Sequence, residues 1–226
     1  MALASSVNIG CGEHAGNADL TRTTIDEAVR LGRRWGLHPG YPDRAGFGRV
    51  GIQLTTARTY LASVFQQVRK WHQYAAPAYI KPHGAFYHDT SPIVPRELMR
   101  VALTDDMAVW LNQFPGVNAL TMLCRTHQLP LMGFPGSAHF VIAMRGRVRF
   151  IREGFADRGY REDGRLLSRQ DPGGVLTDPE QVAAQVVMLA SRVETICIHG
   201  DGEHAVTVAE TARVALERAR FRIAAP

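Results

Sequence analysis

Titratable side chains follow short apolar runs at five places along the chain. The residues concerned are Glu13 and His14, His38, Lys81 and His83, Asp157 and Arg158, and His199 with Asp201. In parallel α/β folds the loops at the carboxyl ends of the strands converge on one face, and reactive groups gather there. The repeated pattern therefore predicts a functional site that is built from several strand ends.

Two of these places carry the strongest catalytic signal. Lys81 and His83 come directly after an apolar run, where a charged group is costly to bury without a partner. His199 also ends an apolar run, and Asp201 lies close enough in sequence to orient it as a base or a ligand. We therefore expect Lys81, His83, His199 and Asp201 to be catalytic.

The segment HPGYPDRAGFGR (38–49) adds an imidazole, a carboxylate and a guanidinium in a loop rich in proline and glycine. A stiff loop loses little entropy when it positions a polar group, which suits a catalytic role for Asp43. Judged alone, a turn with a solvated Asp43 explains the segment equally well.

The glycine-rich segment 8–17 precedes a predicted helix, where glycines let backbone N–H groups approach an anion. A tight turn between strand and helix explains the same residues. Asp157 and Arg158 either contact a ligand or pair with each other. The substrate-binding candidates are His14, His38, Arg49, Asp157 and Arg158.

Histidine and carboxylate ligands from several strand ends suit zinc or another divalent ion. The sequence contains no HExxH motif, so a metal is permitted rather than indicated, with His14, His38 and His83 as candidate ligands. It also has neither a GxxxxGK[ST] loop nor a GxSxG elbow, so any nucleotide site is of another kind.

The hydrophobic pattern alternates between short apolar runs and amphipathic stretches. The expected strands are 7–11, 37–38, 78–80, 129–134, 148–151 and 195–198, and the expected helices are 19–35, 55–74, 96–112, one from 137, one from 178 and 205–216. The segment 117–128 fits either state. Alternation of this kind predicts a parallel sheet with helices outside it, in a single domain over residues 1–226.

Composition narrows the class of protein. The net charge of +5 comes from dispersed arginines without a nucleic-acid-binding module, so an anionic substrate or an acidic partner explains it as well. No apolar stretch is long enough for a membrane span, and the N-terminus lacks the pattern of a secretory signal. The three cysteines are far apart, which argues against a disulfide framework, and we expect a cytoplasmic protein.

Five stretches together resemble the LamB/YcsF family. They are VNIGCGEHAGNAD (7–19), GLHPGYPDRAGFGR (36–49), YIKPHGAFY (79–87), GFADRGYREDGRLLSR (154–169) and ICIHGD (196–201). The resemblance implies an irregular seven-stranded (β/α) barrel of the glycoside hydrolase/deacetylase type. Family members usually begin with a strand like D-L-N-C-D-x-G-E before the segment matched at Val7, so this chain is expected to lack the first strand of the barrel.

The resemblance also implies a reaction, the hydrolysis of the lactam 5-oxo-L-proline to L-glutamate by the A subunit of a 5-oxoprolinase. ATP, with Mg, is then a co-substrate, and subunits B and C are partners. In that reaction Lys81 and Arg49 are expected to contact anionic groups, and His83 or His199 to do acid–base work. Orientation or metal binding is expected of Asp43, Asp157 and Asp201.

Two other interpretations of the sequence stay open. One is a metal-dependent deacetylase or amidohydrolase that acts alone, without ATP. The other is a truncated, non-catalytic subunit that binds its partner subunits. A homo-oligomer is compatible with each of them.

Overall fold

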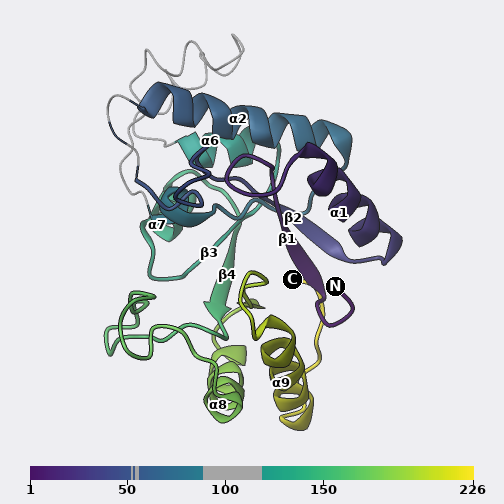
Figure 1. Ribbon diagram of the computed structural model, residues 1–226, viewed down its shortest axis with the longest axis vertical. Helices are drawn as coiled ribbons and strands as arrows, with labels where there is room; N and C mark the ends of the chain where they lie inside the picture. The colour runs from purple at the N-terminus through teal and green to yellow at the C-terminus, as the bar shows by residue number, and fades with distance from the viewer. Residues whose placement is uncertain (52, 54–55, 89–118) are drawn as a thin grey trace. The chain divides into compact units, whose positions relative to one another are not determined.

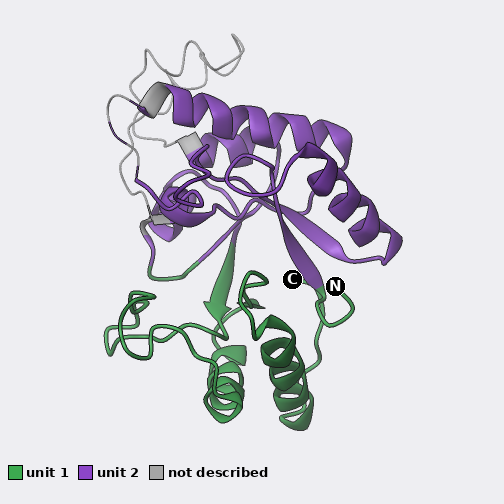
Figure 2. Cartoon of the chain, in the orientation of Figure 1, with its two compact units in different colours: residues 1–5, 134–136, 151–226 green, residues 6–133, 137–150 purple. Residues whose placement is uncertain are grey.

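The computed structural model describes residues 1–51, 53, 56–88 and 119–226 (Figure 1). These residues form two compact units (Figure 2). Unit 2 comprises residues 6–133 and 137–150, and unit 1 comprises residues 1–5, 134–136 and 151–226. The expectation of a single domain over residues 1–226 stays a prediction.

Unit 2 is built on parallel strands. Strand β1 (Ser6–Gly10) pairs with β2 (Arg34–His38) in a register that sets Gly10 opposite His38. Parallel bridges then join Leu37 to Ile80 and Ile80 to Leu131, the first residue of β3 (Leu131–Gly133). The chain segments that follow β1, β2 and Ile80 therefore start at one edge.

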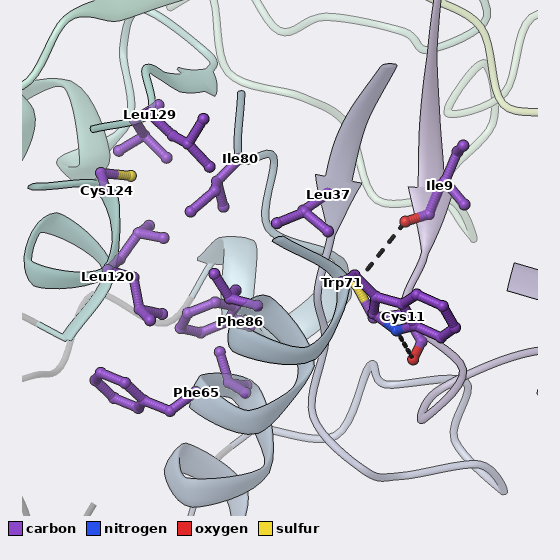
Figure 3. Packing of buried hydrophobic residues seen from close by; sticks show 14 of the residues in the cluster. Ile9, Cys11, Leu37, Phe65, Trp71, Ile80, Phe86, Leu120, Cys124 and Leu129 are labelled. Atoms are coloured by element: carbon purple, nitrogen blue, oxygen red, sulfur yellow. Dashed lines mark hydrogen bonds between the residues drawn. The ribbon is translucent and has the colours of Figure 1, made fainter. Parts of the chain in front are cut away.

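Among the described residues of unit 2, five helices connect these strands. They are α1 (Ala18–Arg30), α2 (Ala57–Tyr74), α3 (Gly84–His88), α6 (Ala119–Thr126) and α7 (Ala138–Arg145). Their apolar faces bury Phe65, Trp71 and Leu120 against strand residues such as Leu37 and Ile80 (Figure 3). The indole N–H of Trp71 donates to the carbonyl of Cys11 (3.0 Å), which satisfies the one polar atom that this large side chain buries.

Unit 1 repeats the parallel arrangement. Strand β4 (Phe150–Phe155), of which residues 151–155 belong to this unit, pairs with β5 (Thr195–Cys197) and sets Phe155 opposite Cys197. Helix α8 (Pro179–Ala190) begins with proline after Asp178, whose carboxylate accepts from the amides of Glu180 and Gln181. Helix α9 (Ala205–Arg218) packs with α8 over a small apolar cluster that contains Val182, Val186, Val208 and Ala212.

The expected mixed α/β fold with parallel strands is confirmed, with local corrections. The helix expected over 19–35 already ends at Arg30, because Gly32 takes a positive φ of 62° and the chain from Arg34 pairs with β1 as a strand. The strand expected at 78–80 is reduced to the bridges of Ile80, and 119–126 of the ambiguous segment is helix.

The helix expected at 96–112 lies outside the described residues. The described strands do not close into a barrel, so the seven-stranded barrel stays a prediction. Within the described ranges no helix has the length and apolar character needed to cross a bilayer.

Gly36, in the middle of β2, leaves room for the ring of Tyr79. A Cβ at this position would overlap ring atoms of Tyr79, which is fully buried and whose hydroxyl donates to the carbonyl of Val7. We expect Gly36→Ala to lower the free energy of unfolding by about 1–3 kcal/mol, measured by urea denaturation. The control is Gly51→Ala, because a Cβ there meets no atom within 4 Å in the described structure. Equal urea midpoints for Gly36→Ala and the unmutated protein would contradict this packing.

Candidate functional site

Three of the histidines predicted from the sequence lie together in unit 2. His14 stacks on His83 with ring centroids 4.0 Å apart and planes 8° from parallel. His38 meets His83 edge-on, with centroids 4.8 Å apart. The parallel strands explain the cluster, because His14 follows β1, His38 ends β2 and His83 follows Ile80.

A chain of hydrogen bonds runs through two of these rings. Nδ1 of His38 lies 2.7 Å from the carbonyl of Lys81, Nε2 of His38 lies 3.0 Å from Nδ1 of His83, and Nε2 of His83 lies 2.8 Å from the carbonyl of Phe47. Carbonyls only accept, so both outer nitrogens must donate, and the middle bond also needs a proton. Three protons are one more than two neutral imidazoles carry, so the complete chain has one positive charge.

The surroundings oppose that charge. Burial, the charge of Lys81, and the neighbouring His83 and His14 hold the pKa of His38 well below its usual value, although the bond to the Lys81 carbonyl works the other way. The His38–His83 pair therefore needs a compensating negative charge before it can hold all three protons.

His14 is buried, with 4% of its surface exposed. Burial, His83, Arg44 and Arg49 lower its pKa to about 3, so the ring is neutral at pH 7. Its Nδ1 is buried without a hydrogen-bond partner among the described residues. An unpaired lone pair is tolerated better than an unpaired N–H, which puts the proton on Nε2.

Glycines make room for this ring. A Cβ at Gly40 would lie 2.8 Å from Nδ1 of His14, and one at Gly48 would lie 2.9 Å from the Cβ of His14. Gly48 also has a positive φ of 66°. The two glycines of the loop after β2 therefore let its backbone close over the imidazole.

These histidines do not fit a metal ion in this arrangement. The four ring nitrogens of His38 and His83 are all engaged in the hydrogen-bond chain, and Nδ1 of His14 faces Gly40. Over the described ranges no three His, Cys, Asp or Glu side chains are grouped so as to hold a metal. The candidate ligand set His14, His38 and His83 is not supported by this geometry.

The other residues predicted from the loop after β2 have structural contacts of their own. The carboxylate of Asp43 accepts from the amides of Gly46 (2.8 Å) and Val50 (3.2 Å), so it fastens the loop to itself. The guanidinium carbon of Arg49 lies 4.9 Å from the centroid of the Phe47 ring. Arg49 lies near the histidine cluster, because its charge lowers the pKa of His14.

Two residues that hold this loop in place were missed from the sequence. Arg44 donates to the carbonyls of Gly12 and Gly16, both at 2.6 Å, and so ties the glycine-rich segment to the loop after β2. Gln67 of α2 bonds to both backbone groups of Gly40, donating to its carbonyl at 2.7 Å. The sequence did contain a signal for Gln67, because this polar residue lies among the apolar positions of the predicted helix.

Unit 1 contains a second group, formed by Asp157 and His199. The carboxylate of Asp157 accepts from the backbone N–H of His199 (2.9 Å) and from Nδ1 of its ring (2.9 and 3.0 Å). The ring stacks on Phe155, with centroids 5.6 Å apart. The pairing of Phe155 with Cys197 explains the contact, because Asp157 and His199 each follow two residues later.

The contact between Asp157 and His199 affects the pKa of Asp157 and the tautomer of His199. Burial raises the pKa of the Asp157 carboxyl, but the hydrogen bonds and charge of His199 outweigh it and hold the pKa below the usual value. Since Nδ1 of His199 donates to Asp157, the lone pair of the neutral ring is on Nε2. That nitrogen makes no hydrogen bond to any described residue, and the side chain is 24% exposed.

Two further residues predicted in this unit are Asp201 and Arg158. Asp157 is a carboxylate that contacts His199, and Asp201 is exposed in the following turn. Arg158 donates to the carbonyls of Gly174 (2.9 Å) and Leu167 (2.6 Å), so its guanidinium holds the loop of residues 159–174.

Parallel strands that end in an imidazole cluster in one unit, and in a carboxylate–imidazole pair in the other, are typical of an α/β enzyme. The profile of the LamB/YcsF family matches residues 1–226, and the chain belongs to this family.

Similar proteins agree with the family assignment. Proteins named as the A subunit of 5-oxoprolinase, from Mycobacterium avium (strain 104) and Heliobacterium modesticaldum, are 38% and 32% identical to this chain. Each match covers 100% of this chain and 89% of the relative. A crystal structure of a lactam utilization protein from Thermus thermophilus superposes with a TM-score of 0.74 at 26% identity, over 99% of this chain and 90% of that one.

The lowered pKa of His14 makes the fold sensitive to acid. Between pH 6.5 and about 3 the unfolded chain binds a proton at His14 that the folded chain refuses, so stability falls as the pH falls through this window. We expect His14→Phe, which keeps a flat ring on His83, to remove up to about 1.4 kcal/mol per pH unit from this dependence. Urea denaturation between pH 7 and pH 5 measures it. An unchanged slope in the variant would contradict the buried, neutral state of His14.

Proposed function

We propose that this chain is the A subunit of an ATP-dependent 5-oxoprolinase, which hydrolyses 5-oxo-L-proline to L-glutamate. The observation that carries the proposal is the relative of that name from Mycobacterium avium, which is 38% identical over the entire chain. The lactam utilization protein with the similar fold supports the same class of substrate.

The chemistry explains why ATP and further subunits are needed. The carbonyl of an unstrained five-membered lactam is a poor electrophile, and transfer of a phosphoryl group from ATP to its oxygen releases ADP and activates the carbon. Water attacks this carbon, the C–N bond breaks to leave an acyl phosphate, and a second water releases phosphate to give L-glutamate. The relatives are named as one lettered subunit, which implies other subunits, and we propose B and C subunits as partners that supply the activated lactam. Dependence on ATP favours a cytoplasmic location. For the complete strand arrangement we propose the irregular barrel that the family resemblance implies.

We assign proton transfer to His199. Its Nε2 carries a lone pair and its side chain is partly exposed, while Asp157 holds the ring in that tautomer. In the hydrolysis, Nε2 accepts a proton from the attacking water and returns it to the lactam nitrogen as the C–N bond breaks. Asp157 stabilises the imidazolium formed in between.

We assign anion binding to the cationic residues of unit 2. Lys81 and Arg49 lie beside the imidazoles of His14, His38 and His83, as their effects on the pKa values of His14 and His38 indicate. A carboxylate or phosphoryl group there would supply the negative charge that the His38–His83 pair needs for its third proton. His83 then acts as part of the charged His38–His83 pair. Asp43 orients the loop after β2, and for Asp201 we propose a role in orientation.

The assignment of His199 can be tested in the assembled complex. We expect His199→Ala to reduce 5-oxo-L-proline-dependent ATP hydrolysis by about 10²–10⁴-fold, because the proton acceptor is lost. His204→Ala is the control, since this exposed histidine precedes α9 without capping it by its side chain. Turnover of His199→Ala within twofold of the unmutated complex would reject the assignment.

The proton count of the histidine pair gives a second test. Binding of 5-oxo-L-proline at pH 7 should be accompanied by uptake of up to one proton, because the ligand carboxylate offsets the charge of the complete hydrogen-bond chain. Calorimetric titrations in buffers of different ionisation enthalpy measure this uptake. We expect His38→Asn to abolish it and His72→Gln, on α2, to leave it intact. Binding by the unmutated complex without proton uptake contradicts the charged pair.

A further inference from the structure

Gln185 of α8 reaches from its helix to the loop that follows β4. Its amide nitrogen Nε2 lies 2.7 Å from the carbonyl oxygen of Phe155, 3.1 Å from that of Ala156 and 2.9 Å from that of Arg158. One side chain thus contacts three carbonyls of a four-residue segment.

These contacts enclose Asp157 on both sides. The carbonyls of Ala156 and Arg158, its chain neighbours, face Gln185. The carbonyl of Asp157 itself accepts from the amide of Leu176 (3.0 Å), and the amide of Ala156 donates to the carbonyl of Cys197 (3.0 Å). The backbone around Asp157 is therefore held from three directions, and its carboxylate is left to contact His199.

The convergence of these carbonyls depends on a donor. Three carbonyl oxygens around one point repel one another, and only N–H groups at that point make the arrangement favourable. Gln185 supplies two such hydrogens. Apolar side chains on this helix, Val182, Val186 and Leu189, already provide its packing, so the helix itself does not require an amide here.

We propose that Gln185 is a positioning residue that fixes the orientation of His199 through Asp157. It touches neither ring nor carboxylate and acts by holding the main chain from which Asp157 projects. The consequence for catalysis rests on the role that we propose for His199, whereas the effect on the geometry of the Asp157–His199 pair does not.

Three variants separate this role from simple packing. Gln185→Met keeps the length and helix preference of the side chain without its N–H groups, and Gln185→Glu keeps the shape but presents oxygens to the three carbonyls. Gln181→Met is the control, since Gln181 is exposed one turn earlier on α8.

In the assembled complex we expect Gln185→Met to lower kcat for 5-oxo-L-proline by about 10–100-fold with little change in KM, as for other residues that orient a functional imidazole. Gln185→Glu should be impaired at least as much, and Gln181→Met should match the unmutated complex. Unchanged kcat in both Gln185 variants would overturn the inference.

A readout that does not depend on activity is the proton NMR signal of the His199 Nδ1–H, shifted downfield by its bond to Asp157 and identified by its loss in His199→Gln. We expect the signal to be lost or to exchange faster with water in Gln185→Met at an unchanged Tm, and to persist in Gln181→Met. A persistent signal in Gln185→Met overturns the inference, as does global unfolding of Gln185→Met while Gln181→Met folds. Loss of the signal in a complex without 5-oxoprolinase activity would support the inference and reject the proposed function instead.

Discussion

Parallel strand pairing is the constraint on which the rest of the structure depends. A parallel neighbour requires a crossover, so each strand in this chain is followed by a loop that starts at the same edge as the loop after its partner. In unit 2 this places His38 beside the segment that carries His14, and in unit 1 it brings Asp157 to His199. The polar groups lie close together because paired parallel strands end at the same edge of the sheet, where the loops that carry these groups begin.

The loops that carry these groups contain little regular structure, so their shape comes from side chains that bond to main-chain atoms. Gln67 and Arg44 do this in unit 2, and Gln185 and Arg158 do it in unit 1. The polar head of each of these side chains bonds to main-chain carbonyls of the loops. The same long polar side chains thus stabilise the fold and shape its loops, and Arg44 and Arg158 have this role among the arginines of a basic protein.

The sequence was sufficient to predict the helices and strands whose hydrophobic residues recur with a clear period. Helix α8 was expected from the cap at Asp178 and the proline after it, and the strand ends were expected from apolar runs that stop at a polar residue. The sequence was insufficient where a single backbone contact decides where a helix or strand ends. The end of α1 depends on Gly32 and on the pairing of Arg34 with β1, which no local pattern contains.

The same limit applies to the site. Residue type and position after a strand predicted His14, His38, His83 and His199 as site residues, and the structure brings the first three together. They were not enough to find the partner of His199, because Asp157 is 42 residues away and becomes its neighbour only through the β4–β5 pairing. Nor could they show that His38 and His83 share a hydrogen-bond chain.

The three cysteines can report local unfolding of the protein through their rates of alkylation. All are buried and free of disulfides, which limits the access of an alkylating reagent, and burial also raises the pKa of the Cys11 thiol to about 12. Cys11 and Cys124 belong to unit 2 and Cys197 to unit 1. The labelling rate of each thiol therefore follows the local unfolding of its own unit, so the cooperativity between the two can be measured without adding any probe.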